Sequence, residues 1–98
     1  MEMFKQKEFT LDMGFPLDDF IKRLFDQGKF VCRQEANLIN IDYQGESLQL
    51  TLGKQRLRRV LSEQQAILPI HFNFSNMSQA KQAQFMDIFM LKFQRGGG

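Results

Sequence analysis

Apolar and polar residues alternate along most of the segment from Lys29 to Leu61, which is the pattern of half-buried β-strands. Turn signals interrupt the alternation at Ala36-Asn37, Gly45-Glu46 and Gly53-Lys54. The two turns that begin with glycine are typical of two-residue, type II′ hairpins. The segment therefore predicts one continuous antiparallel meander.

The three turns also predict which side chains face each other across the meander. Around the first glycine turn Tyr43 faces Leu48, and around the second Leu50 faces Leu57. Because a slip of one residue would move every apolar side chain to the other face, agreement among the turns supports the assignment of faces. The other predicted pairs are Ile41 with Leu50, Ile39 with Leu52, Leu48 with Arg59, Phe30 with Tyr43, and Cys32 with Ile41.

Segments before and after the meander predict further elements. Residues Lys7–Met13 alternate as a strand, and Leu17–Gln27 has helical apolar spacing, with Pro16 in the first turn and Gly28 as its C-terminal cap. The strand Ile67–Phe74 follows the meander. A last helix begins at Asn76 or Ser78 as N-cap and is predicted to bury an apolar arc. That arc contains Phe85, Met86, Phe89, Met90 and Phe93.

These elements predict an α+β fold in the order β-α-β-β-β-β-β-α. We expect a curved antiparallel sheet with two helices packed on one face. We expect residues 1–95 to form a single domain and Gly96–Gly98 to be a flexible tail. Two points stay open in the sequence. Lys54–Ala66 also fits a helix. Pro69 has no N–H to donate to a neighbouring strand, so it favours a sheet edge or the start of a strand.

The meander's other face is polar and contains several arginines. Its two predicted rows are Arg33, Asn40, Thr51 and Arg56, and Val31, Asp42, Gln49 and Arg58. Forked hydrogen bonds from guanidinium groups suit phosphates and carboxylates, so this face is a candidate site for an anion or an acidic partner. The candidate residues are Arg33, Asn40, Gln49, Arg56, Arg58 and His71.

Composition argues against a catalytic or metal-binding protein. The chain has one histidine and one cysteine, and the predicted register turns Cys32 to the core and His71 to the outside. A thiolate–imidazole pair and a zinc site are therefore not expected, and we predict neither a metal nor a cofactor. A single cysteine and the absence of a long apolar run favour a cytoplasmic protein without a membrane span.

The last helix suggests a binding surface for another protein. Ile88 and Leu91 fall outside its predicted core arc, so a protein partner or a second copy would bury them. We therefore expect a non-catalytic interaction or adaptor module that self-associates. The alternative is a binder of nucleic acid or a phosphorylated small molecule on the arginine-bearing sheet face. The net charge of +2 does not favour nucleic acid.

The closing segment Ile70–Arg95, roughly a quarter of the 98 residues, resembles the last strand and helix of PilZ domains. In both, an apolar strand leads through a serine-containing turn to an apolar helix that ends in Gln-Arg. That family binds cyclic dinucleotides through an arginine pair and an Asp/Asn-x-Ser-x-x-Gly strand upstream of this helix. Here Asn73–Ser78 lacks the glycine and directly precedes the helix, so the resemblance implies no cyclic-dinucleotide site.

Overall fold

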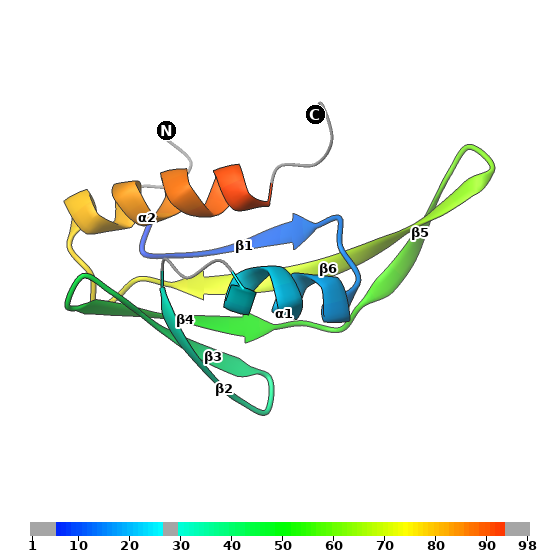
Figure 1. Cartoon of the computed structure of the whole chain (residues 1–98). Coiled ribbons are helices and arrows are strands. Elements are labelled where there is room, and N and C mark those ends of the chain that lie inside the picture. Colours follow the sequence, from blue (N-terminus) through cyan, green and yellow to red (C-terminus); the bar gives the residue numbers. More distant parts are fainter. Residues whose placement is uncertain (1–5, 27–29, 94–98) are drawn as a thin grey trace.

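The computed structural model describes residues 6–26 and 30–93, and it has the predicted order of elements (Figure 1). It is an α+β fold whose antiparallel sheet has six strands and is open. None of the described helices is long and apolar enough to cross a bilayer. The elements are β1 (Glu8–Met13), α1 (Leu17–Asp26), β2 (Val31–Glu35), β3 (Leu38–Tyr43), β4 (Glu46–Leu52), β5 (Arg56–Val60), β6 (Glu63–Asn73) and α2 (Gln79–Lys92).

The main sheet has the strand order β1-β6-β4-β3-β2, and both helices join the core on its apolar face. Phe20 of α1 stacks on Phe93 with 4.9 Å between ring centroids, and Phe89 of α2 meets Phe72 of β6 edge-on at 5.2 Å. Each such aromatic pair contributes roughly 0.5–1.5 kcal/mol beyond the burial of its area. The two helices and the sheet thus share one phenylalanine-rich core.

The first glycine turn lies one residue earlier than predicted, which shifts the pairing of β3 with β4 by two residues. The loop is Gln44-Gly45, with φ values of 49° and 84°, and Ile41 pairs with Leu48 instead of Leu50. A type I′ hairpin needs positive φ at both loop residues, and this pair provides it. Because side chains alternate with period two, a shift of two residues leaves every side chain on its predicted face. The β2–β3 pairing, which aligns Cys32 with Ile41, is as predicted.

The second glycine turn, Gly53-Lys54, is not a hairpin, and this prediction was wrong. Strand β4 pairs with β6, with Leu50 opposite Phe72, while β5 pairs with the beginning of β6, with Leu57 opposite Ala66. The predicted pairs of Leu50 with Leu57 and of Leu48 with Arg59 are therefore absent. Segment 54–66 is not helical. It contains β5, a turn at Leu61-Ser62 and the start of β6.

Pro69 lies in the central strand β6 and not at an edge, which corrects the expectation from sequence. Gly53 N donates to Pro69 O at 2.8 Å, so the backbone of Pro69 faces the irregular segment between β4 and β5. The pairing register shifts by one residue across this segment, as in a β-bulge. A proline is tolerated there because the bulge requires no N–H from it.

The helices bury narrower apolar faces than their sequences predict. Phe20 and Leu24 of α1 are fully buried, whereas Leu17 and Phe25 at its two ends are partly exposed. In α2 the buried set omits Met90, which is 40% exposed. Ser78 is the N-cap, and its Oγ accepts from Lys81 N at 3.3 Å. The predicted cap Gly28 and the predicted tail 96–98 lie outside the described residues.

Candidate functional site

The outer face of the main sheet gathers part of the residues predicted to bind anions. Arg33, Asn40 and Gln49 pair in one cross-strand row, which continues through Asn73 to Glu8. His71 lies in the neighbouring row, opposite Thr51 and Thr10. The sheet therefore places Arg33, Asn40, Gln49 and His71 on one face.

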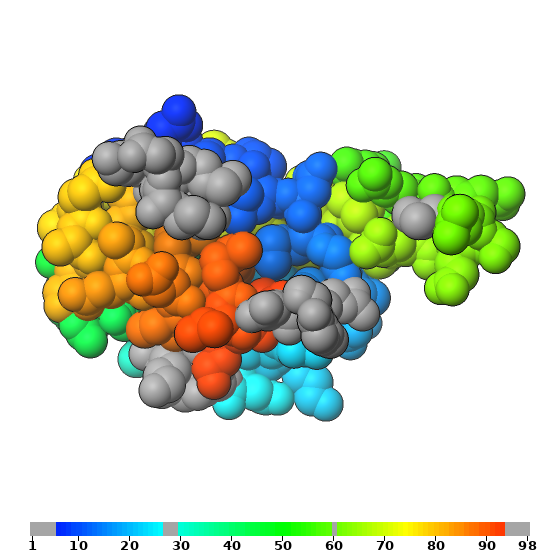
Figure 2. Space-filling view, turned by 90° about the horizontal axis from the view of Figure 1, so that it is seen from above, coloured from blue at the N-terminus to red at the C-terminus, as the bar shows by residue number. Residues whose placement is uncertain are grey.

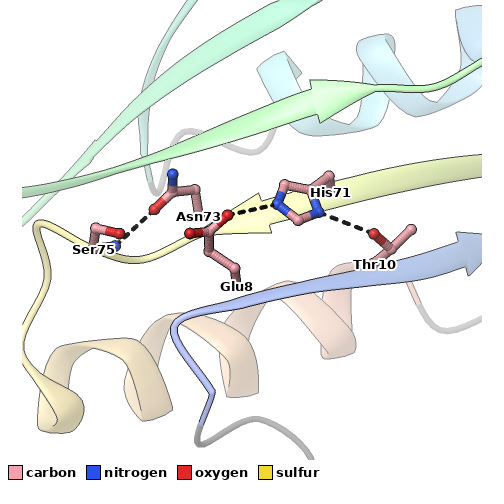
Figure 3. A network of polar contacts seen from close by, with 5 residues as sticks. All are labelled: Glu8, Thr10, His71, Asn73 and Ser75. Carbon is pink, nitrogen blue, oxygen red and sulfur yellow. Dashed lines mark hydrogen bonds and ion pairs between the residues drawn. The ribbon is translucent and has the colours of Figure 1, made fainter.

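Side chains on this face bond mainly to one another (Figure 3). His71 lies between Glu8 Oε1, 3.1 Å from its Nε2, and Thr10 Oγ1, 3.0 Å from its Nδ1. Gln49 Nε2 donates to Asn40 Oδ1 at 3.0 Å. Hydrogen bonds across strands satisfy these groups and hold the side chains in place.

The charge of the outer face is not the cationic one predicted. Four carboxylates share this face with Arg33. This count covers the described residues of β1 to β4 and residues 68–73 of β6. A hollow of about 340 Å³ beside Arg33 is also lined by Glu35. The predicted arginine row is therefore divided. The four carboxylates are those of Glu8, Asp12, Glu35 and Asp42.

Arg56 and Arg58 lie elsewhere, on a two-stranded arm formed by residues 56–67. In the arm, β5 pairs with the first five residues of β6, with Arg56 opposite Ile67 and Arg58 opposite Gln65. Figures 1 and 2 show the arm projecting from the rest of the molecule. Four basic residues lie between residue 54 and the turn at Leu61-Ser62: Lys54, Arg56, Arg58 and Arg59.

Large apolar side chains on the arm remain in contact with solvent. Leu57 is 62% exposed, and Leu61 at the tip is 93% exposed. Leu61 also has a φ of 57°, a left-handed conformation that costs a residue with a Cβ roughly 1–2 kcal/mol. An exposed apolar side chain thus occupies a position whose backbone favours glycine or asparagine.

The base of the arm is attached to the body. Arg56 Nη2 lies 3.1 Å from Asp12 Oδ2 on β1, and Leu17 N, the first donor of α1, bonds Gln55 Oε1 at 2.7 Å. Gly53 packs tightly here, because a Cβ on it would meet Pro69 O at 2.9 Å. These contacts set the direction of the arm while leaving its tip exposed.

The predicted interface residues of α2 have different surroundings. Leu91 is 71% exposed, as expected for a surface residue. Ile88 is partly buried and packs against the core, so its predicted place outside the core face was wrong. A helical wheel shows only which side chains share a face of α2, and it does not show how much of that surface packs against the core. Leu91 by itself is an ordinary exposed leucine.

Cys32 is a free thiol, half-buried, and its Sγ approaches Leu24 O at 3.9 Å. Burial raises the pKa of Cys32 to about 11, which disfavours the nucleophilic thiolate. Residues 6–26 and 30–93 contain no group of three or more side chains suited to hold a metal ion.

No family model, curated protein or solved structure matches the chain. The site is therefore interpreted from its own chemistry.

The arm is the feature that the sequence did not predict. Its signal was Arg59, which the predicted hairpin placed on the core face opposite Leu48. A buried arginine opposite leucine contradicts the apolar pattern of the meander, and such a conflict argues against the pairing that produces it. In the structure Arg59 is exposed and pairs with Gln64.

Proposed function

We propose that the protein is a non-catalytic, cytoplasmic interaction module that self-associates and binds a protein partner through its arm. One observation carries this proposal: Leu61 is 93% exposed in a left-handed conformation at the tip of a projecting ribbon. Both features are unfavourable for the isolated chain, and backbone strain of this kind is concentrated at functional sites. Burial of Leu61 by a partner would compensate for them.

The rest of the arm supports the same function. A two-stranded ribbon is marginally stable on its own, and this one also exposes Leu57. Protein–protein interfaces usually have apolar side chains at their centre and a polar rim, and arginine is enriched in them. The arm has this composition. The partner we expect has an apolar recess bordered by carboxylates.

Three tagged variants test the arm in a lysate of the encoding organism, with captured proteins identified and then rebound as purified components. We expect Leu57→Ser and Leu61→Gly to lose the identified partner. Leu91→Ser, which removes an exposed leucine of α2, serves as the matched control and should retain it. Equal binding by all three variants would refute the arm as the binding element.

A second candidate function is binding of nucleic acid or a phosphorylated small molecule. The observation that favours it is the placement of Arg56, Arg58 and Arg59 on one strand of the arm, and not on the sheet face. A salt titration with labelled duplex and single-stranded DNA tests this candidate. Contacts to phosphates predict an affinity that falls steeply with salt and is reduced by Arg58→Glu. DNA binding that changes neither with salt nor with Arg58→Glu excludes this second candidate function.

A further inference from the structure

The two sides of β6 are covered over different lengths. On one side β1 pairs with β6 only from Leu68 to Asn73. On the other side β4 pairs with residues 70–73, and β5 pairs with residues 63–67. In the part of the chain that the structure describes, no strand lies along the β1 side of residues 63–66.

Backbone groups along this uncovered edge point outward. Pro69 O faces the side of β4 and β5, where it accepts from Gly53 N, whereas Phe74 N faces the β1 side, where it donates to Lys7 O. Orientation alternates along a strand, so odd residues of β6 face β4 and β5, and even residues face the β1 side. The N–H and C=O groups of Gln64 and Ala66 are therefore directed to the uncovered edge.

A hollow of about 520 Å³ runs beside this edge. It extends from Leu61 at the tip to Gly14 and Pro16 at the base of the arm, and Asp19 and Glu63 also line it. An exposed edge with free donors and acceptors is a template for strand addition. The hollow leaves room for an added strand along residues 63–66.

We infer that the partner strand is the same segment, residues 63–66, of a second copy of this chain, paired antiparallel about a twofold axis. The inference rests on the proposed function and names the partner for self-association. A segment that pairs antiparallel with itself forms an isologous interface, which closes as a dimer. The two arms then lie side by side, and each Leu61 reaches the end of the other hollow near Gly14 and Pro16.

The charges of the arm favour this edge over the opposite one. Segment 63–66 reads Glu-Gln-Gln-Ala, so a twofold axis through Gln64 or Gln65 pairs glutamine amides and keeps each Glu63 away from its equivalent. Self-pairing along β5 would instead bring arginines against arginines, which is unfavourable. Each arm would also bring its Arg59 toward Asp19 on the border of the other hollow.

Sedimentation velocity of the purified full chain, from low micromolar to millimolar concentration, tests the inference. Gln64→Pro removes an N–H that faces the uncovered edge and leaves the ladder with β5 intact. Leu61→Gly removes the apolar tip at a position whose φ suits glycine. We expect a wild-type dimer, a dissociation constant raised at least tenfold in both variants, and no change in Leu91→Ser.

Exchanging the charges of Arg59 and Asp19 provides a second test. Its result does not depend on whether any single variant folds less stably than the wild type. Arg59→Glu and Asp19→Arg should each weaken the dimer, because each homodimer then contains two like-charge contacts. A mixture of the two variants restores opposite charges at both contacts, so a heterodimer should form with near wild-type affinity. Absence of heterodimer recovery would overturn the predicted arrangement of the two arms.

The remaining outcomes separate this inference from the proposed function. A wild-type chain that is monomeric at every concentration overturns the inference, whereas loss of an identified partner in Leu61→Gly would still support the arm as a binding element. A dimer that persists in Gln64→Pro and is lost in Leu91→Ser overturns the inference and assigns self-association to α2.

Discussion

Three described hairpins turn at residues with positive φ, and two of them, β3–β4 and β5–β6, have opposite surroundings. The β3–β4 hairpin turns at Gln44-Gly45, where Lys81 Nζ donates to the Gln44 side chain, and Ser78 N donates to Glu46 Oε1 at 2.7 Å. The β5–β6 hairpin turns at Leu61, which is 93% exposed. The first hairpin is therefore joined to the start of α2, whereas the second projects from the body.

The difference between them shows how one chain separates stability from binding. Leu48 and Leu50 of β4 are almost fully buried beneath the helices, while Leu57 of β5 is mostly exposed. Burial of a leucine stabilises a fold by roughly 1.5–3 kcal/mol, and an exposed leucine contributes little until a partner covers it. Substitutions in the body and in the arm should therefore differ in their effects on stability and reactivity.

The largest difference in the loss of unfolding free energy is expected between a substitution of a core phenylalanine and one of an arm leucine. Phe72 is fully buried and its ring contacts Phe9, Phe74 and Phe89. Phe72→Ala should lower the free energy of unfolding by about 3–5 kcal/mol, because it leaves a cavity. Leu57→Ala should lower it by less than about 1 kcal/mol. Urea unfolding at low protein concentration measures both, and equal losses would contradict the distinction between body and arm.

Thiol reactivity should differ between the body and the arm. Burial raises the pKa of Cys32 from 9.0 to about 11, so at pH 8 its thiolate fraction is roughly a hundredfold below that of a free thiol. Cys32 should therefore react with iodoacetamide roughly a hundredfold more slowly in the folded chain than in the chain unfolded by guanidinium. A Ser62→Cys variant that also carries Cys32→Ser should react at the unfolded rate when monomeric. Fast labelling of folded Cys32 would contradict its burial.

The same pKa shift has a defined sign for stability. The folded state favours the neutral thiol, so this contribution is complete below pH 9 and is lost as the pH rises toward 11. Cys32→Ser should remove that part of the alkaline destabilisation, which pH-dependent urea unfolding would detect.

The contact between the docked hairpin and α2 predicts a moderate effect. Glu46 accepts from Ser78 N at the start of α2, where a lost cap typically costs about 1 kcal/mol. Glu46→Ala should therefore destabilise the chain by about that amount, whereas Glu63→Ala on the arm should change stability by less than about 0.5 kcal/mol. Thermal unfolding of the two variants compares them, and a reversed order would refute the contrast.

The smallest effect is expected at the base of the arm. Arg56 and Asp12 form an ion pair in which both side chains are 55% exposed. Exposed pairs contribute roughly 0.2–1 kcal/mol, so a double-mutant cycle of Arg56→Ala and Asp12→Ala should give a coupling within that range. A coupling well above it would mean that the pair does more than align the arm.

The sequence predicted the body well because local pattern and burial agree there. Alternation placed Ile39, Ile41 and Leu48 on the buried face, and even the two-residue error at Gln44-Gly45 preserved that assignment. Ser78 was correctly named as a candidate cap because N-cap chemistry depends on residues close in sequence. Such features need no information about distant segments.

The arm was not predicted because its local pairing of residues 56–60 with 63–67 competes with a hairpin at Gly53-Lys54, and a contact distant in sequence decides between them. A glycine turn at Gly53-Lys54 has the same residue pattern as a hairpin, and only the pairing of β4 with β6 excludes it. Arg56 and Arg58 therefore lie on the arm and not in the predicted cross-strand rows of the sheet face, which divides the predicted site. Arg59 and Pro69 were the two residues that did not fit the predicted sheet. Pro69 lies opposite the segment where the register changes, and Arg59 lies within the arm.

Amide hydrogen exchange of Gln64, Gln65 and Ala66 tests whether a second copy of the chain completes the arm. In the dimer, we predict that Gln64 and Ala66 exchange slowly at high protein concentration and quickly after dilution. Gln65, which faces β5, should remain protected in both conditions. Fast exchange of Gln64 and Ala66 at every concentration, with Gln65 protected, would contradict the claim.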